Sequence, residues 1–561
     1  MSSTHPWSDH WSDPSVAHPA ASSTPHDDAD PDGFSSAALP DEHTRLLPNR
    51  INSEPRPRAY LSPSDPAVSP YNLWTVRFLR GTTVALFLAA VAWWLVLVVA
   101  TFVTPPGLHV RGSPFLALAY ASLALLTLAV SLLFFAAPSR SARALGLAAA
   151  GLLAADAAAL LAAPGLRRAE LWPGVASAVW AAAAAAWSAA VGKTVKWGKA
   201  EEERRLTGRP ETRRSVAEWG EVVLATAGLG VVAAAAALVT ANLVLRAADG
   251  GLAPPGERYW VDGGRYRVHL YCSGNATDPA TGARTTTLLL EGGEDPVEQG
   301  LWQFAENAVR NGSIRRFCFA DRPGMAWSDA APSPFSASTA SDTLSEALSR
   351  AGEQGPWILA SAGIGSLYSR VFSSRHGDDV RGLLLIDPLH EDLLGRVGSP
   401  GRGFLLWARG VASPCGVERL LGAVLRGRSA ADRVWGRSWR WSGKALFSRL
   451  QESLVAESLT RRDVVSSRAI QDEATPLVVV SSGKQLREDR EWEDKQRDLT
   501  HLTRNLLAWD IVQDAPHRVW DSLEGRQVME KRLRGLVRDA RSQDPASNHQ
   551  QRGVEPASYG I

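Results

Sequence analysis

The chain has 561 residues, a net charge of +2, and a composition that changes strongly along its length. A charge so near balance gives no support for a nucleic-acid partner. The three cysteines, Cys272, Cys318 and Cys415, are too few for a disulfide scaffold and lack metal-ligand spacing with histidine. We therefore expect no metal and no cofactor. One disulfide and buried free thiols both stay open as interpretations.

Residues 1–70 are predicted to form a disordered cytosolic tail, because they are rich in Ser, Pro, His, Asp and Ala and lack apolar periodicity. No apolar run stands at the extreme N-terminus, so no cleavable signal peptide is expected. Within the tail, Glu42, Leu46 and Leu47 resemble an acidic dileucine sorting signal. Cytosolic coat adaptors read such signals on the way to endosomes, lysosomes or the vacuole. Sorting adaptors are thus one expected partner, with a chance match as the alternative.

A membrane region is predicted over residues 71–246, with about five helices. Each apolar stretch is near the ~20 residues that a helix needs to cross a bilayer. The third and fourth are alanine-rich and weaker, and the third contains Asp156. A helix–helix hydrogen bond is the favoured role for that carboxylate, ahead of a proton site or a transporter-like unit. The five stretches are 82–103, 114–137, 144–163, 172–191 and 222–245.

The predicted orientation follows from a basic loop at 192–221, which carries eight Lys and Arg residues and is expected to be cytosolic. With five spans, the N-terminus is then cytosolic and everything after residue 246 is luminal. The glycosylation sequons at Asn275 and Asn311 lie on that luminal side. An endomembrane or vacuolar location is expected. A mitochondrial membrane is the alternative, although the acidic first 60 residues make a poor transit peptide.

From about residue 258 to 540 the pattern is that of a soluble α/β domain. Strands alternating with helices predict a mostly parallel sheet covered on both faces. Residues 541–561 are polar and predicted to be disordered. The expected strands are 265–272, 286–291, 316–320, 357–360, 382–388 and 476–480, and the expected helices include 337–352 and 364–375.

One strand-to-helix turn, at 356–370, has the small residues of a nucleophile elbow, G-x-S-x-G. Small residues are needed there because strand and helix approach closely and the turn residue is strained. Ser361 and Gly365 occupy the flanking small positions. The nucleophile position itself is Gly363, which has no side chain to attack a carbonyl.

Three motifs in this order resemble the α/β-hydrolase superfamily, in the branch that reads D-R-x-G-x-x-W-S-D. They are residues 321–329, the elbow with its following Leu-Tyr-Ser-Arg, and the Leu-Ile-Asp-Pro run ending at Pro388. The resemblance covers about 258–540. It implies an α-helical transmembrane bundle followed by an α/β-hydrolase fold with a helical lid at 391–472. This combination is similar to uncharacterised fungal integral membrane proteins.

The resemblance also implies roles for individual residues. His517 stands where the family keeps its catalytic histidine, and Asp387 ends a core strand where some relatives place the acid. The backbone N–H of Ile364 would form the oxyanion hole with one from Gly292, Gly293 or Glu294. The commoner place for the acid is a later loop, where the candidates are Glu488, Asp489, Glu491 and Asp494.

Gly363 cannot form an acyl-enzyme, so the sequence predicts a degenerate hydrolase domain that acts as a ligand-binding or interaction module. The alternative is a membrane-tethered ester or lipid hydrolase that uses Ser361 or an activated water. Ser361 would need the elbow position, which puts Leu359 where a small residue is required. Trp and Arg residues of the predicted lid could face the lipid bilayer or a lipid-like or ester ligand, with solvated charges as the alternative.

Overall fold

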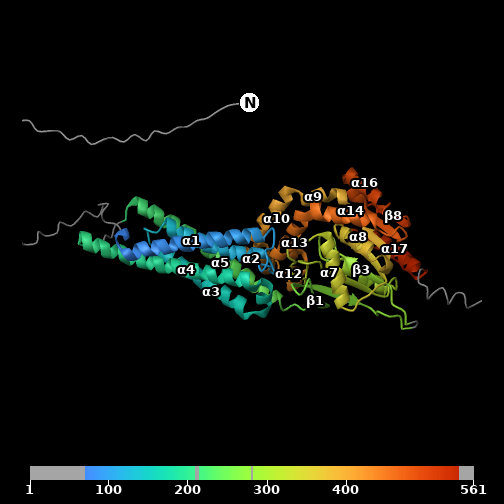
Figure 1. The fold of residues 1–561 in the computed structure, drawn as a ribbon, viewed down its shortest axis with the longest axis horizontal. Coiled ribbons are helices and arrows are strands. Elements are labelled where there is room, and N and C mark those ends of the chain that lie inside the picture. Colours follow the sequence, from blue (N-terminus) through green and yellow to red (C-terminus); the bar gives the residue numbers. More distant parts are fainter. Residues whose placement is uncertain (1–69, 209–213, 280–281, 543–561) are drawn as a thin grey trace, which may run out of the picture. The chain divides into compact units, whose positions relative to one another are not determined.

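The computed structural model describes residues 70–208, 214–279 and 282–542 (Figure 1). The predicted sorting motif at Glu42, Leu46 and Leu47 lies outside these residues, as do most of the predicted N-terminal tail and the C-terminal tail from residue 543. The part that is described contains a bundle of long helices followed by an α/β domain.

Five of the described helices are long and apolar enough to cross a membrane, judged by length and composition. Both alanine-rich stretches are among them. The prediction of a helical transmembrane bundle followed by an α/β domain is therefore confirmed (Figure 1, blue to green). The helices are α1 (Trp74–Ala100), α2 (Pro114–Leu133), α3 (Arg140–Ala162), α4 (Pro164–Thr207) and α5 (Val216–Asp249).

The predicted basic loop at 192–221 is wrong over its first half, because α4 continues through it to Thr207. Lys, Glu, Arg and Ala, which favour helix, fill this stretch, and no proline interrupts it. The helix ends at Gly208, whose φ of 79° is left-handed. A new helix then begins at Val216, where the Ser215 hydroxyl accepts from the Glu218 N–H at 3.2 Å.

Polar contacts join the helices inside the bundle. The Tyr120 hydroxyl of α2 donates to Asp156 Oδ2 of α3 at 3.1 Å, and both side chains are buried. Trp93 of α1 donates through Nε1 to the Ser177 hydroxyl of α4 at 3.0 Å. These bonds give polar groups partners on neighbouring helices, and the Tyr120–Asp156 bond is a helix–helix hydrogen bond of the kind favoured for Asp156.

The α/β domain contains one eight-stranded sheet among the described residues, in the order β1-β2-β4-β3-β5-β6-β7-β8. Strand β2 is antiparallel to β1 and β4, and the other neighbouring strands are parallel. The sequence did not predict β1 and β8. Both are edge strands with several exposed residues, so they lack the continuous apolar run of the central strands. The strands are β1 (Glu257–Val261), β2 (Tyr266–Ser273), β3 (Thr287–Glu291), β4 (Phe317–Ala320), β5 (Trp357–Ala362), β6 (Val380–Ile386), β7 (Leu477–Ser482) and β8 (Leu506–Val512).

Helices cover both faces of this sheet and bury its two apolar surfaces (Figure 1). On one face pack α7 (Ala337–Arg350) and α8 (Gly365–Arg375). On the other pack α6 (Leu301–Arg310) and α17 (Leu523–Ser542). Helices α15 (Gly483–Glu488) and α16 (Arg490–Leu499) follow β7. Between β6 and β7, where the lid was expected, lie α9 (Leu394–Gly398), α10 (Pro400–Ala412), α11 (Val417–Leu425), α12 (Ala430–Val434), α13 (Gly443–Val455) and α14 (Arg461–Ala469).

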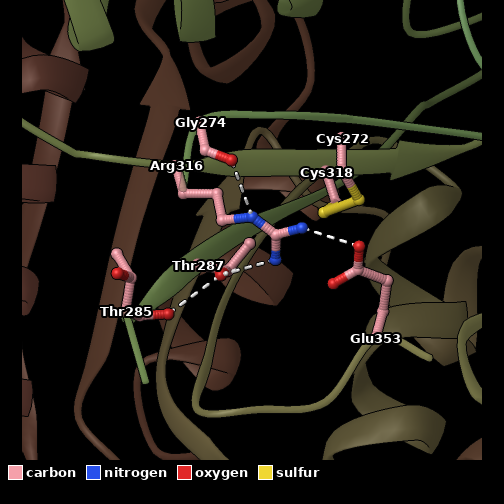
Figure 2. Close-up of a disulfide and its surroundings, with 7 residues drawn as sticks. All are labelled: Cys272, Gly274, Thr285, Thr287, Arg316, Cys318 and Glu353. Atoms are coloured by element: carbon pink, nitrogen blue, oxygen red, sulfur yellow. Dashed lines mark hydrogen bonds and ion pairs between the residues drawn. A yellow bond between two sulfur atoms is a disulfide. The ribbon is translucent and has the colours of Figure 1, made fainter. Parts of the chain in front are cut away.

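A disulfide joins Cys272 of β2 to Cys318 of β4, which face each other in the antiparallel register (Figure 2). Beside it, Arg316 donates to Glu353 at 2.6 Å and to the Gly274 carbonyl at 3.3 Å. Of the two interpretations left open by the sequence, the structure has the disulfide. Among the described residues, Cys415 is the free cysteine.

Candidate active site

The turn between β5 and α8 has the geometry of a nucleophile elbow. Gly363 occupies the turn with a φ of +46°, in the left-handed region that favours glycine. Two residues later, a Cβ on Gly365 would lie 2.1 Å from the carbonyl oxygen of Gly292. The close approach of helix α8 to the loop after β3 therefore requires glycine at position 365. The turn therefore has the backbone shape of an elbow, and its tip residue, Gly363, has no nucleophilic side chain.

Asp387 follows β6 and holds the candidate histidine. It is buried, and its φ of +40° is the strained conformation often found at functional sites. Its Oδ1 accepts from the Ser482 N–H and from Trp492 Nε1, both at 3.1 Å. Its Oδ2 lies 2.6 Å from Nδ1 of His517. The structure thus brings together the two residues that the resemblance paired.

The alternative acids face other partners. Asp489 caps α16 by accepting from the Trp492 N–H at 3.2 Å and also pairs with Arg396. Glu491 lies 2.5 Å from the same guanidinium, and Asp494 is 3.8 Å from Arg497. Asp387 is therefore the acid that contacts His517.

The side chain of Glu294 fills the space above Gly363, which the sequence did not predict. A Cβ on Gly363 would lie 2.7 Å from Glu294 Oε2 and 2.9 Å from Oε1. The Ile364 N–H donates to Oε1 at 3.4 Å, and the N–H of Glu294 itself also bonds this carboxylate. These are two of the expected oxyanion-hole donors. The carboxylate therefore occupies the place of the missing nucleophile and of the oxyanion it would generate.

His517 links the two carboxylates. Its Nε2 lies 3.2 Å from Glu294 Oε2, opposite the Nδ1 that faces Asp387. Burial opposes protonation, but hydrogen bonds and charge from the two carboxylates raise the pKa of His517 to about 10. Burial likewise opposes ionisation of Glu294, yet His517 lowers its pKa to about 2. With these pKa values His517 is protonated and Glu294 is ionised at neutral pH, and an imidazolium has no lone pair with which to accept a proton.

The loop that carries Glu294 is held from two sides. Arg322, from the D-R-x-G motif, donates to the carbonyls of Gly292 and Gly293 and pairs with Glu291 at 2.9 Å. From the lid interval, Arg449 of α13 donates to the Glu294 carbonyl at 2.8 Å. Both anchors bond the backbone of this loop, so they hold the point from which the Glu294 side chain extends toward Gly363.

Ser361, the alternative nucleophile, is not brought to the histidine. It lies within β5, opposite Leu385 of β6 and Glu291 of β3. Its side chain is buried, and its hydroxyl makes no hydrogen bond among the described residues. Both nitrogens of His517 are occupied by Asp387 and Glu294.

A second group of titratable residues lies in the interior, away from the elbow. Donor atoms of His269, Asp321 and Glu298 lie within 4.8 Å of one another, close enough to hold a metal ion. His269 Nδ1 is 2.9 Å from Asp321 Oδ2. Burial, together with the charge of Asp321, raises the pKa of Glu298 well above its ordinary value and favours its neutral form. The nearby Lys444 supplies a positive charge, so the group is better suited to sharing a proton than to holding a cation.

The described chain has helices long and apolar enough to cross a membrane, followed by an α/β domain of the α/β-hydrolase fold with glycine at the turn between β5 and α8. The family model described as "Region of unknown function (DUF2417)" matches residues 42–272. "Uncharacterized protein C23C11.06c" of Schizosaccharomyces pombe is 31% identical over 534 residues, which cover 90% of this chain and 98% of that protein. The chain belongs to the family of this fission-yeast protein.

A more distant relative is described as an "Uncharacterized vacuolar membrane protein" of Saccharomyces cerevisiae. It is 26% identical over 325 residues, half of each chain. Among solved structures, carboxylesterases of Nitrososphaera gargenis match 50% of this chain and 100% of theirs, with 14% identity and a TM-score of 0.37. A thermophilic esterase from Thermogutta terrifontis matches 51% and 99%, with 15% identity and a TM-score of 0.35.

Proposed function

We propose that this protein is a vacuolar or other endomembrane protein whose α/β-hydrolase domain is a non-catalytic ligand-binding or interaction module. The observation that carries the proposal is the Glu294 carboxylate, which lies over Gly363 and is ion-paired to His517. The D-R-x-G-x-x-W-S-D branch of the superfamily is the group to which we assign the domain. In this assignment Arg322 of the motif serves to hold the Glu294 loop.

Each step of serine-hydrolase chemistry meets an obstacle here. Covalent catalysis needs a nucleophile, and Gly363 has none. General-base catalysis needs a histidine that can accept a proton near neutral pH, and the pKa of His517 is raised to about 10. A carboxylate whose pKa is lowered to about 2 is itself a weak base. The oxyanion donors at Ile364 and Glu294 already bind an anion from the protein's own chain.

An active hydrolase is the second candidate, and the intact Asp387–His517 pair favours it. In that case a ligand would displace Glu294 from the elbow, His517 would lose its second carboxylate, and a water or Ser361 would act as the nucleophile. Both candidates retain the bilayer as a partner, with a lipid-like or ester ligand for the domain and sorting adaptors for the N-terminal tail.

The proposed orientation has the N-terminus in the cytosol and the α/β domain in the lumen. The Cys272–Cys318 disulfide supports it, since disulfides persist in oxidising compartments. The vacuolar description of the budding-yeast relative supports the location. Asn275 is exposed and available for glycosylation, whereas the Asn311 amide donates to Glu530 at 3.1 Å. A glycan that is lost in Asn275→Gln would report the luminal side, and one that is absent from both sequons would count against it.

The test of catalysis is labelling of the full-length, detergent-solubilised protein with a serine-reactive fluorophosphonate. The wild type is expected to stay unlabelled. Gly363→Ser alone should label weakly, because its Cβ would stand 2.7 Å from the Glu294 carboxylate. Gly363→Ser combined with Glu294→Ala should label strongly, because the new hydroxyl then faces a histidine paired only with Asp387.

The matched control is Ser361→Ala, placed in the wild type and in the double variant. Loss of wild-type labelling on Ser361→Ala would establish the hydrolase alternative and refute the non-catalytic proposal. Failure of the double variant to label, while it runs as a single species on size exclusion, would show that the elbow and His517 are not arranged as a triad.

A further inference from the structure

A cavity lies away from the elbow, where the ends of membrane helices meet the α/β domain. Its volume is about 520 Å³, within the range of small-molecule sites. The start of α2, the α3–α4 connection, the end of α5, strands β1 and β2 and the lid interval all contribute to its wall. Neither Gly363 nor Glu294 nor His517 lines it.

The wall of this cavity is strongly cationic. Among the described residues, seven arginines and one lysine line it, against two carboxylates. Both carboxylates are already engaged: Asp249 pairs with Arg419 at 2.8 Å and with Arg433 at 2.6 Å, while Asp329 pairs with Arg267 at 2.9 Å. Arg419 and Arg433 thus share one carboxylate, and Arg267 has another.

The remaining cations are less compensated. Arg246 pairs with the buried Glu170, which stands just outside the lining. Arg168, at the start of α4, and Arg258, in β1, have no ion-pair partner among the described residues. Lys444 donates to the carbonyls of Ala326 at 2.6 Å and Ser328 at 2.8 Å and has no carboxylate in contact among those residues.

Neighbouring positive charges lower the pKa values of two of these groups, Arg258 and Lys444. Burial lowers the pKa of Arg258, and the charges of Arg267 and Arg168 lower it further. Burial is also the main reason that the pKa of Lys444 falls to about 8, with Arg258 and Arg246 contributing. Asp329 opposes both shifts. Positive charges gathered in one cavity without a carboxylate repel one another, and an anionic ligand would relieve that repulsion.

We infer that this cavity binds a phosphate-bearing ligand through Arg168, Arg258 and Lys444. Arginine forks match phosphate oxygens, and a phosphomonoester, with a charge of about −1.5 to −2, would offset most of the charge of these three cations. Helix ends lie at the level of lipid headgroups when the helices span a bilayer, so a phospholipid headgroup and a soluble phosphate ester are the two sources of this chemistry. The inference does not depend on whether the elbow is catalytic.

Calorimetric titration of the full-length protein in a zwitterionic detergent tests the site with three probes. They are dioctanoyl phosphatidate, glycerol 3-phosphate and inorganic phosphate. Arg168→Ala and Arg258→Ala should each weaken phosphatidate binding about tenfold, since a hydrogen bond to a charged group is worth roughly 1.5–3 kcal/mol. Equal sensitivity of glycerol 3-phosphate would identify a soluble ester as the ligand class, and sensitivity of phosphatidate alone would identify a lipid.

Arg167→Ala is the matched control, because Arg167 is the sequence neighbour of Arg168 and does not line the cavity. It should leave binding unchanged. The inference is overturned if Arg167→Ala weakens binding as much as Arg168→Ala, which would indicate general attraction of anions to a basic surface. It is also overturned if no probe binds the wild type. Arg168 and Arg258 have no ion-pair partner to lose among the described residues, so the two variants should fold.

Discussion

The elbow and the cationic cavity differ in whether their charged side chains have partners of opposite charge. At the elbow, His517 stands between Asp387 and Glu294, so each charge has a partner within the chain. In the cavity, Arg168 and Arg258 face other cations without a carboxylate of their own. A site whose charges are satisfied internally gains little from a ligand, whereas a site with unpaired charge is stabilised by one. This contrast is why we propose ligand binding at the cavity rather than at the elbow.

The largest expected effect comes from a part of the cavity where the charges are paired, at Asp249. Asp249→Asn would leave Arg419 and Arg433 buried without their shared carboxylate. Breaking a buried ion pair typically costs about 3–5 kcal/mol, so we expect a loss near that range. Thermal unfolding of the solubilised protein, followed by tryptophan fluorescence, measures it. A change below about 1 kcal/mol would mean that α5 and the lid interval do not depend on this contact.

At the elbow, Asp387→Asn should destabilise the protein by about 2 kcal/mol, because a buried group would lose a hydrogen-bond partner. The remaining oxygen can still accept from Ser482 or Trp492, which limits the loss. The same unfolding experiment applies, with Asp494→Asn as the control at an exposed acid. Equal stability of the two variants would contradict the central role assigned to Asp387.

The charged centre also predicts a dependence on pH. The folded pKa of His517, about 10, exceeds its ordinary 6.5, so its contribution to stability is complete below pH 6.5 and disappears as pH rises through about 10. Glu294→Gln should shift that loss to lower pH, because one carboxylate no longer holds the proton. The side chains of His517 and Glu294 are 35% and 43% exposed, so water screens the pair and the shift should be modest.

Unfolding temperatures measured from pH 6 to pH 10 check this prediction. Glu524→Gln, at an exposed helix position, is the control for removal of a negative charge. Parallel pH profiles for the wild type and Glu294→Gln would show that Glu294 does not hold the proton on His517.

The smallest expected effect has the opposite sign. Arg168→Ala should stabilise the ligand-free protein by about 0.3 kcal/mol, because it relieves repulsion from Arg258 at a partly exposed site. High salt should abolish the difference. Arg167→Ala serves again as the control. Destabilisation by Arg168→Ala alone would show that this arginine has a structural role, and the contrast between the two sites would then fail.

Much of the fold could be predicted because its signals are local. Runs of about 20 apolar residues indicated the five membrane helices, and short apolar runs indicated the central strands. The edge strands β1 and β8 were missed because exposure on one side dilutes that pattern. The extension of α4 to Thr207 was missed because a charged, helix-favouring stretch looks the same in a loop and in a helix that leaves the membrane.

The candidate site divides in the same way. The glycine at the elbow, and the candidate roles of His517 and Asp387, followed from motif positions in the chain. The sequence predicted a role for the backbone N–H of Glu294 and none for its side chain. An acidic residue directly after Gly292 and Gly293 is nevertheless a signal that a carboxylate could lie beside the elbow. Its side-chain role depends on contact with His517, which is 223 residues away in sequence.

The sequence by itself therefore determined the succession of membrane helices and central strands along the chain, the strand–turn–helix elbow and the glycine at its tip. These properties depend on neighbours within a few turns of chain. Only the tertiary structure decided that Asp387 is the acid in contact with His517, that Cys272 and Cys318 form a disulfide, that Glu294 fills the elbow, and that cations from distant segments line one cavity. Each of these depends on the distance between charges or side chains that only folding brings together.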